Sequence, residues 1–143
     1  MADGDKVQGL EVGSSAEFSK AVTQEDIDLY AQVSGDSNPL HRDPTYAART
    51  RFKAPIAHGM FGAGLISAAL GTKLTPDAVV VYLSQQLRFR LPVAIGDTIT
   101  AEVEVTAIDP EKNVVTLRTD CVNQAGDAVV KGEATVLLDP LAP

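Results

Sequence analysis

The chain has 143 residues, of which 45% are hydrophobic and 22% charged, as is typical of a single globular domain with one core. Its net charge of -7 at pH 7 argues against binding to nucleic acid or to an anionic membrane, because both need a basic face. The single cysteine, Cys121, lies in an alternating segment and predicts a strand thiol rather than a disulfide. No apolar run is long enough to span a membrane, and the first residues lack an apolar signal core. We therefore expect one domain over residues 1–143, located in the cytoplasm.

The first part of the chain predicts one strand and two helices. A strand is expected over residues 10–19, followed by a helix that Thr23 caps and that Gly35 ends. The Asp-Pro pair at residues 43–44 is typical of a helix start, because proline lacks the N–H that would otherwise be unpaired there. This pair predicts a short helix that ends near Arg49.

The second part changes from a helical to a strand pattern. From Gly59 the segment GMFGAGLISAALG is apolar on almost every side, which predicts a helix buried all round. From residue 78 onward, period-two alternation predicts the strands VVVYLSQQLRFR, TITAEVEVTAID, NVVTLRTDCVN and DAVVKGEATVLLD. Short polar turns between them favour an antiparallel meander. The sequence therefore predicts an α+β fold in which a long curved antiparallel sheet wraps around one buried helix.

The loop SGDSNPLHRD, residues 34–43, concentrates groups suited to acid–base chemistry. It contains Asp36 and His41, and His41 is one of only two histidines in the chain. Turn-forming residues between them can bring the carboxylate and the imidazole into one small space, and the following proline restricts Asn38 to an extended conformation. The alternative is a helix C-cap followed by an Asx-turn, with His41 packed locally.

The start of the apolar helix offers a further group. Gly59 lies in the first turn, where backbone N–H groups lack helical partners and the helix dipole presents partial positive charge. A residue without Cβ lets a carbonyl oxygen approach such an amide, so Gly59 suits an oxyanion hole. We interpret His58 as an imidazole that holds the turn. His58 and Asn38 are also candidates for contact with a substrate. Ser67 either bonds back to the carbonyl four residues earlier or points to a ligand.

Together these residues resemble a known family. The run YAQVSGDSNPLHRDPTYA, followed by APIAHGM and then by YLSQQLRFRLPVAIGDTITAEVEV, is similar to the MaoC-like (R)-specific enoyl-CoA hydratases, especially the short members that supply polyhydroxyalkanoate synthesis. The resemblance extends from about residue 12 to residue 138. It implies a hot-dog fold, a homodimer, and a lyase that reversibly hydrates trans-2-enoyl-CoA to (R)-3-hydroxyacyl-CoA, in fatty-acid β-oxidation or in polyhydroxyalkanoate supply. It also implies Asp36 and His41 as the catalytic pair, Gly59 as the oxyanion donor and Ser67 in the acyl pocket.

This chemistry sets the expected cofactors and partners. The thioester itself acidifies C2, so neither a metal nor a redox cofactor is expected, and coenzyme A is part of the substrate. Without a glycine-rich phosphate loop, the CoA phosphates should meet scattered cations such as Arg51, Lys53, Arg88 and Arg90. Arg88 and Arg90 can instead form the solvated face of a strand. The open alternatives are an (R)-3-hydroxyacyl-acyl-carrier-protein dehydratase, a thioesterase of the same fold and a non-catalytic acyl-thioester binding subunit.

Overall fold

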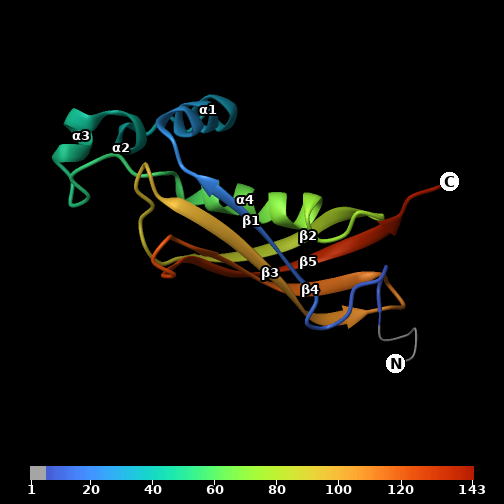
Figure 1. Ribbon diagram of the computed structural model, residues 1–143. Coiled ribbons are helices and arrows are strands. Elements are labelled where there is room, and N and C mark those ends of the chain that lie inside the picture. The colour runs from blue at the N-terminus through green and yellow to red at the C-terminus, as the bar shows by residue number, and fades with distance from the viewer. Residues whose placement is uncertain (1–5) are drawn as a thin grey trace.

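The computed structural model describes residues 6–143, and within them the chain folds into one sheet and four helices. In chain order the elements are β1 (Ser15–Ala21), α1 (Gln24–Ser34), α2 (Pro39–Arg42), α3 (Pro44–Ala48), α4 (Gly59–Thr72), β2 (Ala78–Phe89), β3 (Thr98–Asp109), β4 (Val114–Val122) and β5 (Ala128–Pro140). The strands curve along α4, and α1, α2 and α3 are grouped beyond one end of the sheet (Figure 1).

The sheet is antiparallel throughout, in the order β1-β3-β4-β5-β2. The expected meander is confirmed for β3, β4 and β5 but is wrong for β2, which pairs with β5 instead of β3. The segment 90–97 between β2 and β3 is longer than a hairpin turn, so it can carry the chain from one edge of the sheet toward the other. The first strand, β1, takes the remaining place beside β3.

The inner face of the sheet packs against α4 and forms the core. Ile66 and Leu70 of α4 are at most 1% exposed, as are Val103, Leu117 and Val136 of the sheet. Burial of each such side chain contributes about 1.5–3 kcal/mol to stability. Buried and half-buried positions alternate along β4, because successive side chains face the core and the outer surface in turn. The expected α+β architecture, a curved sheet around a central helix, is confirmed.

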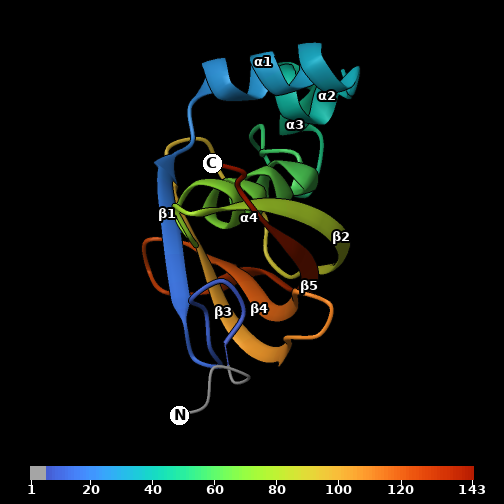
Figure 2. The same ribbon diagram turned by 90° about the vertical axis from the view of Figure 1, so that its right-hand side faces the viewer.

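The central helix differs from its prediction in one respect. It is 14 residues long, and the side that carries Gly64, Ser67 and Gly71 is exposed rather than buried. Within the described chain the sheet covers only the opposite side of α4, while α1–α3 lie beyond it (Figure 2). Among residues 6–143 there is no helix with the length and hydropathy to cross a membrane.

Local sequence signals account for both ends of α1 and for the start of α3. The Thr23 side chain accepts from the Asp26 N–H, and the Asp26 carboxylate accepts from the Thr23 N–H, each at 3.1 Å. Gly35 ends α1 with a φ of 81°, a conformation that glycine adopts without strain. Asp43 caps α3 by accepting from two backbone N–H groups. These helix boundaries agree with the sequence predictions.

Two local predictions are wrong in detail. The first strand begins at Ser15 instead of residue 10, because Gly13 has a φ of 97° and turns the chain just before it. Pro39–Arg42 forms the short helix α2 where a loop was expected. Asn38 caps this helix by accepting from the Leu40 N–H at 3.0 Å, and proline at the first helical position favours the turn.

Candidate active site

A cavity of about 350 Å³ lies beside the first turns of α4. Most of its lining is apolar, with polar side chains confined to His41, His58 and two arginines, Arg51 and Arg90. A mostly apolar cavity with a few convergent polar groups is the usual form of a small-molecule site. This cavity is therefore the candidate active site.

The Asp36 carboxylate lies on an exposed loop that is ordered by short-range hydrogen bonds. The Asp36 N–H donates to the Ser34 hydroxyl at 3.1 Å, and the Asp36 Oδ1 accepts from the Asn38 N–H at 3.2 Å. The second bond is the Asx-turn that the sequence offered as the alternative to a catalytic role. The Asx-turn is therefore present, and it does not exclude a catalytic role, because one carboxylate oxygen of Asp36 still lies within 4.8 Å of a ring nitrogen of each histidine.

The short helix α2 places His41 in the site with a defined tautomer. Its ring is 8% exposed, and its Nδ1 lies 2.7 Å from the Ile56 carbonyl oxygen. A carbonyl oxygen only accepts, so Nδ1 carries a proton. In the neutral ring, Nε2 then has the free lone pair, which makes it the nitrogen able to take a proton from a ligand.

The second histidine, His58, is the N-cap residue of α4 and is 3% exposed. Its Nε2 lies 2.9 Å from the backbone carbonyl oxygen of Asp36, so Nε2 donates. Its ring stacks on His41, with centroids 3.9 Å apart and planes 29° apart, and it lies 4.6 Å from the Tyr30 ring. Its Nδ1 is buried and has no hydrogen-bond partner among the described residues.

The three groups converge on one small volume. One ligand atom from each of Asp36, His41 and His58 lies within 4.8 Å of the others. Two hydrogen bonds of about 2.7–2.8 Å can bridge such a gap through a single water molecule. The same spacing suits a metal less well, because a metal lies in the plane of each imidazole that binds it, and two stacked rings cannot both direct lone pairs at one ion. The arrangement favours acid–base chemistry on a bound water.

Gly59 supplies a free backbone donor at the wall of the same cavity. It is the first residue of α4, and within the described chain its N–H has no recorded acceptor. Its φ lies outside the left-handed region, so the backbone does not demand glycine. A Cβ there would lie only 3.0 and 3.1 Å from Cδ1 and Cε1 of the Phe89 ring. Close approach of this ring is therefore a structural reason for glycine, and an N–H without a helical acceptor is also the kind of group that can donate to an oxyanion.

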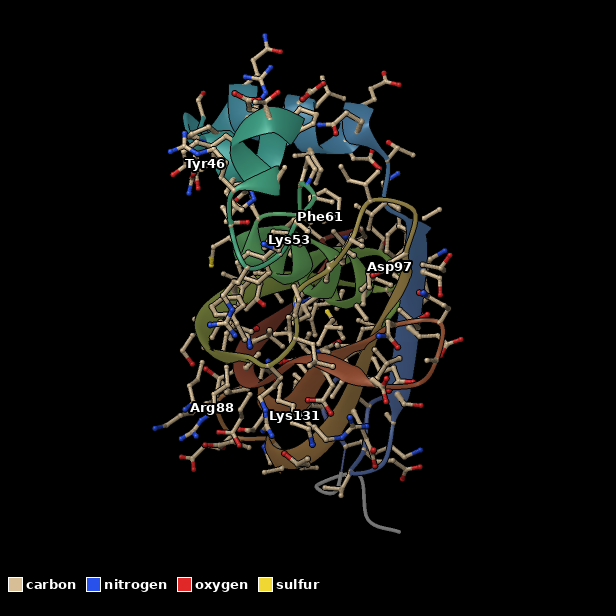
Figure 3. The ribbon with its side chains drawn as sticks, turned by 90° about the vertical axis from the view of Figure 1, so that its left-hand side faces the viewer. Tyr46, Lys53, Phe61, Arg88, Asp97 and Lys131 are labelled. Carbon is tan, nitrogen blue, oxygen red and sulfur yellow. The ribbon has the colours of Figure 1, made fainter. Side chains whose placement is uncertain are left out.

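Only some of the other predicted site residues line the cavity. Asn38 uses its side-chain oxygen to cap α2. Ser67 is exposed on the side of α4 away from the core, and within residues 6–143 its hydroxyl has no recorded bond to the carbonyl four residues earlier. Arg90 and Arg51 line the cavity, whereas Lys53 and Arg88 are outside its lining. Arg88 projects at the outer rim of the sheet, well away from Phe61 (Figure 3).

Sequence reasoning missed three contributors to the site. Ile56 acts through its backbone carbonyl, for which a side-chain pattern holds no signal. Tyr30 was placed on a helix face without a role, yet its ring packs against His58. No role was predicted for Phe89, yet it lines the cavity beside Gly59.

Comparison with known proteins shows which chains are similar. The profile of the MaoC like domain matches residues 8–126. The chain is 49% identical to the (R)-specific enoyl-CoA hydratase of Rhodospirillum rubrum, over 92% of this chain and 90% of the relative. It is 44% identical to the 3-hydroxybutyryl-CoA dehydratase of Methylorubrum extorquens, over 94% and 88%. The solved structure of the (R)-hydratase from A. caviae involved in PHA biosynthesis is similar with a TM-score of 0.87 and 48% identity, covering 92% of this chain and 98% of that one.

The antiparallel sheet around one helix is the hot-dog fold of these structural neighbours. Both the profile match and the similarity to these relatives extend over most of the chain. The chain belongs to the MaoC-like domain family.

Proposed function

We propose that this protein catalyses the reversible, (R)-specific hydration of trans-2-enoyl-CoA to (R)-3-hydroxyacyl-CoA. The observation that carries the proposal is that a carboxylate oxygen of Asp36 and a ring nitrogen of His41 lie within 4.8 Å of each other. Among the described residues, the nearby Gly59 N–H has no recorded acceptor. Relatives at 44–49% identity that are named for this reaction and for its reverse support it.

The geometry provides for each step of the reaction. The thioester oxygen accepts from the Gly59 N–H, which stabilises the enolate-like charge that develops when C3 is attacked. A water between Asp36 and the His41 Nε2 loses one proton to this pair and forms the bond to C3. C2 receives a proton from the same pair, so one water is added and the protein returns to its starting protonation state. No electron is transferred, so the reaction needs no redox cofactor, and because the thioester itself acidifies C2 we expect no metal either.

We expect the CoA part of the substrate to lie at the side of the cavity that carries two arginines. Arg51 and Arg90 line it, in a protein whose net charge is -7. Guanidinium groups pair well with phosphate oxygens, so these two arginines are our candidates for the CoA phosphates. Dehydration of (R)-3-hydroxyacyl-acyl-carrier-protein remains the alternative, because the acid–base pair is equally suited to either carrier.

The exposed edge of the sheet supports a homodimer. β2 is an outer strand, and its Val79, Val81 and Leu83 are exposed. A groove of about 380 Å³ beside it is lined by residues of α4 and β2, including Met60 and Tyr82. An apolar open edge is normally covered by another chain, and a second copy joined along β2 also offers cover for the exposed side of α4. We further propose that the dimer works in the cytoplasm, in fatty-acid β-oxidation or in the supply of polyhydroxyalkanoate precursors.

Two parallel assays on crotonyl-CoA test the proposed reaction. Hydration removes the ultraviolet absorbance of the conjugated enoyl thioester without releasing free thiol, whereas thioesterase activity releases thiol and a binding subunit does neither. The protein's own thiol should not interfere, because burial raises the pKa of Cys121 to about 12. Thiol release, or no change in either signal, would refute hydration. A faster reaction with crotonyl-acyl-carrier-protein would favour the dehydratase alternative.

The catalytic pair is tested by substitution. Asp36→Asn and His41→Gln should each lower the turnover rate about 100-fold or more, because a positioned acid–base group contributes roughly 10²–10⁴. Asp28→Asn, which removes an exposed carboxylate of α1 that pairs with Arg42, is the matched control and should keep normal turnover. Near-normal hydration by either folded site variant would remove that residue from the pair.

A further inference from the structure

The second histidine of the site has a role that the reaction chemistry alone does not assign to it. We infer that His58 is the positioning residue of the active site: it holds Asp36 through the backbone and His41 through ring stacking, without exchanging a proton with the substrate. The inference rests on the proposed hydration and adds a third residue to the pair that carries it.

The first contact acts on Asp36. The loop after α1 is exposed, and its other recorded bonds near Asp36 are short-range, to Ser34 and Asn38. The bond from the His58 Nε2 to the Asp36 carbonyl oxygen spans 22 positions, so it ties this loop to the start of α4. Gly59, the proposed oxyanion donor, is the next residue after His58. One side chain thus ties the backbone of Asp36 to the start of the helix that carries the proposed oxyanion donor.

The second contact acts on His41. Its ring is held at one edge by the Ile56 carbonyl and on one face by the His58 ring, 3.9 Å away. Rotation of the His41 ring would require the His58 ring to move, and His58 is itself packed against Tyr30. The direction of the His41 Nε2 lone pair is therefore set by two independent contacts.

The burial of His58 argues that it serves more than stability. Its Nδ1 is buried without a hydrogen-bond partner among the described residues, and burying an unpaired acceptor costs free energy. An aromatic ring without nitrogen would fill the same space between His41 and Tyr30 without that cost. The Nε2 hydrogen bond to the Asp36 carbonyl oxygen offsets that cost, so the donor, and not the packing of the ring, is what histidine adds at this position.

Two substitutions separate the contacts. His58→Phe keeps a ring for stacking and loses the donor, whereas His58→Gln can place an amide N–H near the Nε2 position and loses the ring. We expect His58→Phe to lower kcat about 10- to 100-fold with KM changed by less than about 3-fold, because small displacements of catalytic groups have effects of this size. Its melting temperature should stay within about 4 °C of the wild type, because the lost Nε2 hydrogen bond and the removed unpaired Nδ1 change stability in opposite directions. His58→Gln should retain kcat within about 5-fold. Tyr46→Phe, which changes an exposed tyrosine of α3 outside the cavity lining, is the control and should keep kcat.

The hydrogen bond from His58 to Asp36 can be tested by NMR without any substrate. The chain has only two histidines, so the imidazole nitrogens in a ¹H–¹⁵N spectrum can be assigned by comparison with His58→Phe. We expect the His58 ring to carry its proton on Nε2 and the His41 ring on Nδ1. A wild-type protein that fails to hydrate crotonyl-CoA would refute the proposed function. The spectrum would then still show whether the His58 Nε2 donates to the Asp36 carbonyl oxygen.

Several results would overturn the inference. A His58→Phe variant with wild-type kcat per folded molecule and a lower melting temperature would show a purely structural residue. A His58→Gln variant as slow as His58→Phe would show that the donor to Asp36 is not the decisive contact. A His58 proton found on Nδ1 would contradict the hydrogen bond from the outset.

Discussion

Replacement of Gly59 by alanine tests the oxyanion donor directly. The new Cβ would lie 3.0 and 3.1 Å from two carbons of the Phe89 ring, which is a few tenths of an ångström tighter than ordinary contact. Because Phe89 is 53% exposed, its ring can move away at a cost of roughly 0.5–1.5 kcal/mol. Alanine gains a similar amount over glycine in a helix, about 1 kcal/mol. Stability should therefore change little, with a melting temperature within about 4 °C of the wild type.

Activity should respond far more strongly than stability. The added methyl group and the displaced ring both occupy the wall at which the thioester oxygen reaches the Gly59 N–H. Loss of one such donor costs about 2.7–4 kcal/mol of transition-state stabilisation, so turnover should fall by roughly 10²–10³. The assay is the rate of crotonyl-CoA hydration per folded active site, measured beside thermal unfolding of the same preparation.

A second substitution separates the donor from the ring. Phe89→Leu removes the crowded ring atoms and serves alone as the control, and Gly59→Ala/Phe89→Leu combines both changes. If the donor matters, the double variant should remain much slower than Phe89→Leu. Recovery to the Phe89→Leu rate would mean that the displaced ring caused the loss. That recovery, or full turnover in folded Gly59→Ala, would refute the oxyanion assignment.

Three further predictions concern stability and assembly. Gly132→Ala should lower the free energy of urea unfolding by about 1–3 kcal/mol, because its Cβ would lie closer than 3.0 Å to the Gln86 backbone oxygen. Gly71→Ala is its control. Apart from the adjacent backbone of its own helix, no atom lies within 4 Å of the added Cβ, so this change should be neutral or stabilising. Leu83→Lys at the exposed β2 edge should give a monomer by sedimentation, whereas an unchanged dimer would place the interface elsewhere. Burial raises the pKa of Asp26, but its hydrogen bonds and a nearby charge lower this pKa overall below 3.8. Its contribution to stability should therefore be present at neutral pH and be lost as the pH falls through the lowered value. Asp26→Asn should be less stable than the wild type at pH 7, and the difference should shrink at about pH 2; a constant difference would contradict the reasoning.

The sequence by itself determined the features that depend on neighbours a few positions apart. Thr23 and Gly35 bound α1, and Asp43 starts α3, because each cap bonds to backbone within one turn. The period of the apolar residues predicted the central helix and the strands for the same reason, since each element exposes and buries its own residues in a regular order. The loop that carries Asp36 and His41 was predicted to bring the two together.

Tertiary structure decided what depends on residues far apart in the chain. The position of β2 beside β5 follows from how the whole sheet closes along α4, which no single segment encodes. Ser67 faces outward because the sheet covers only one side of its helix. The tautomers of both histidines are set by carbonyl oxygens 15 and 22 positions away, and a backbone carbonyl leaves no trace in the identity of its residue. The sequence alone therefore predicted Asp36, His41 and Gly59 as groups of the candidate site, whereas only the packing of the loop, α4 and the sheet added Ile56, Tyr30 and Phe89 to it and determined how the rings are held.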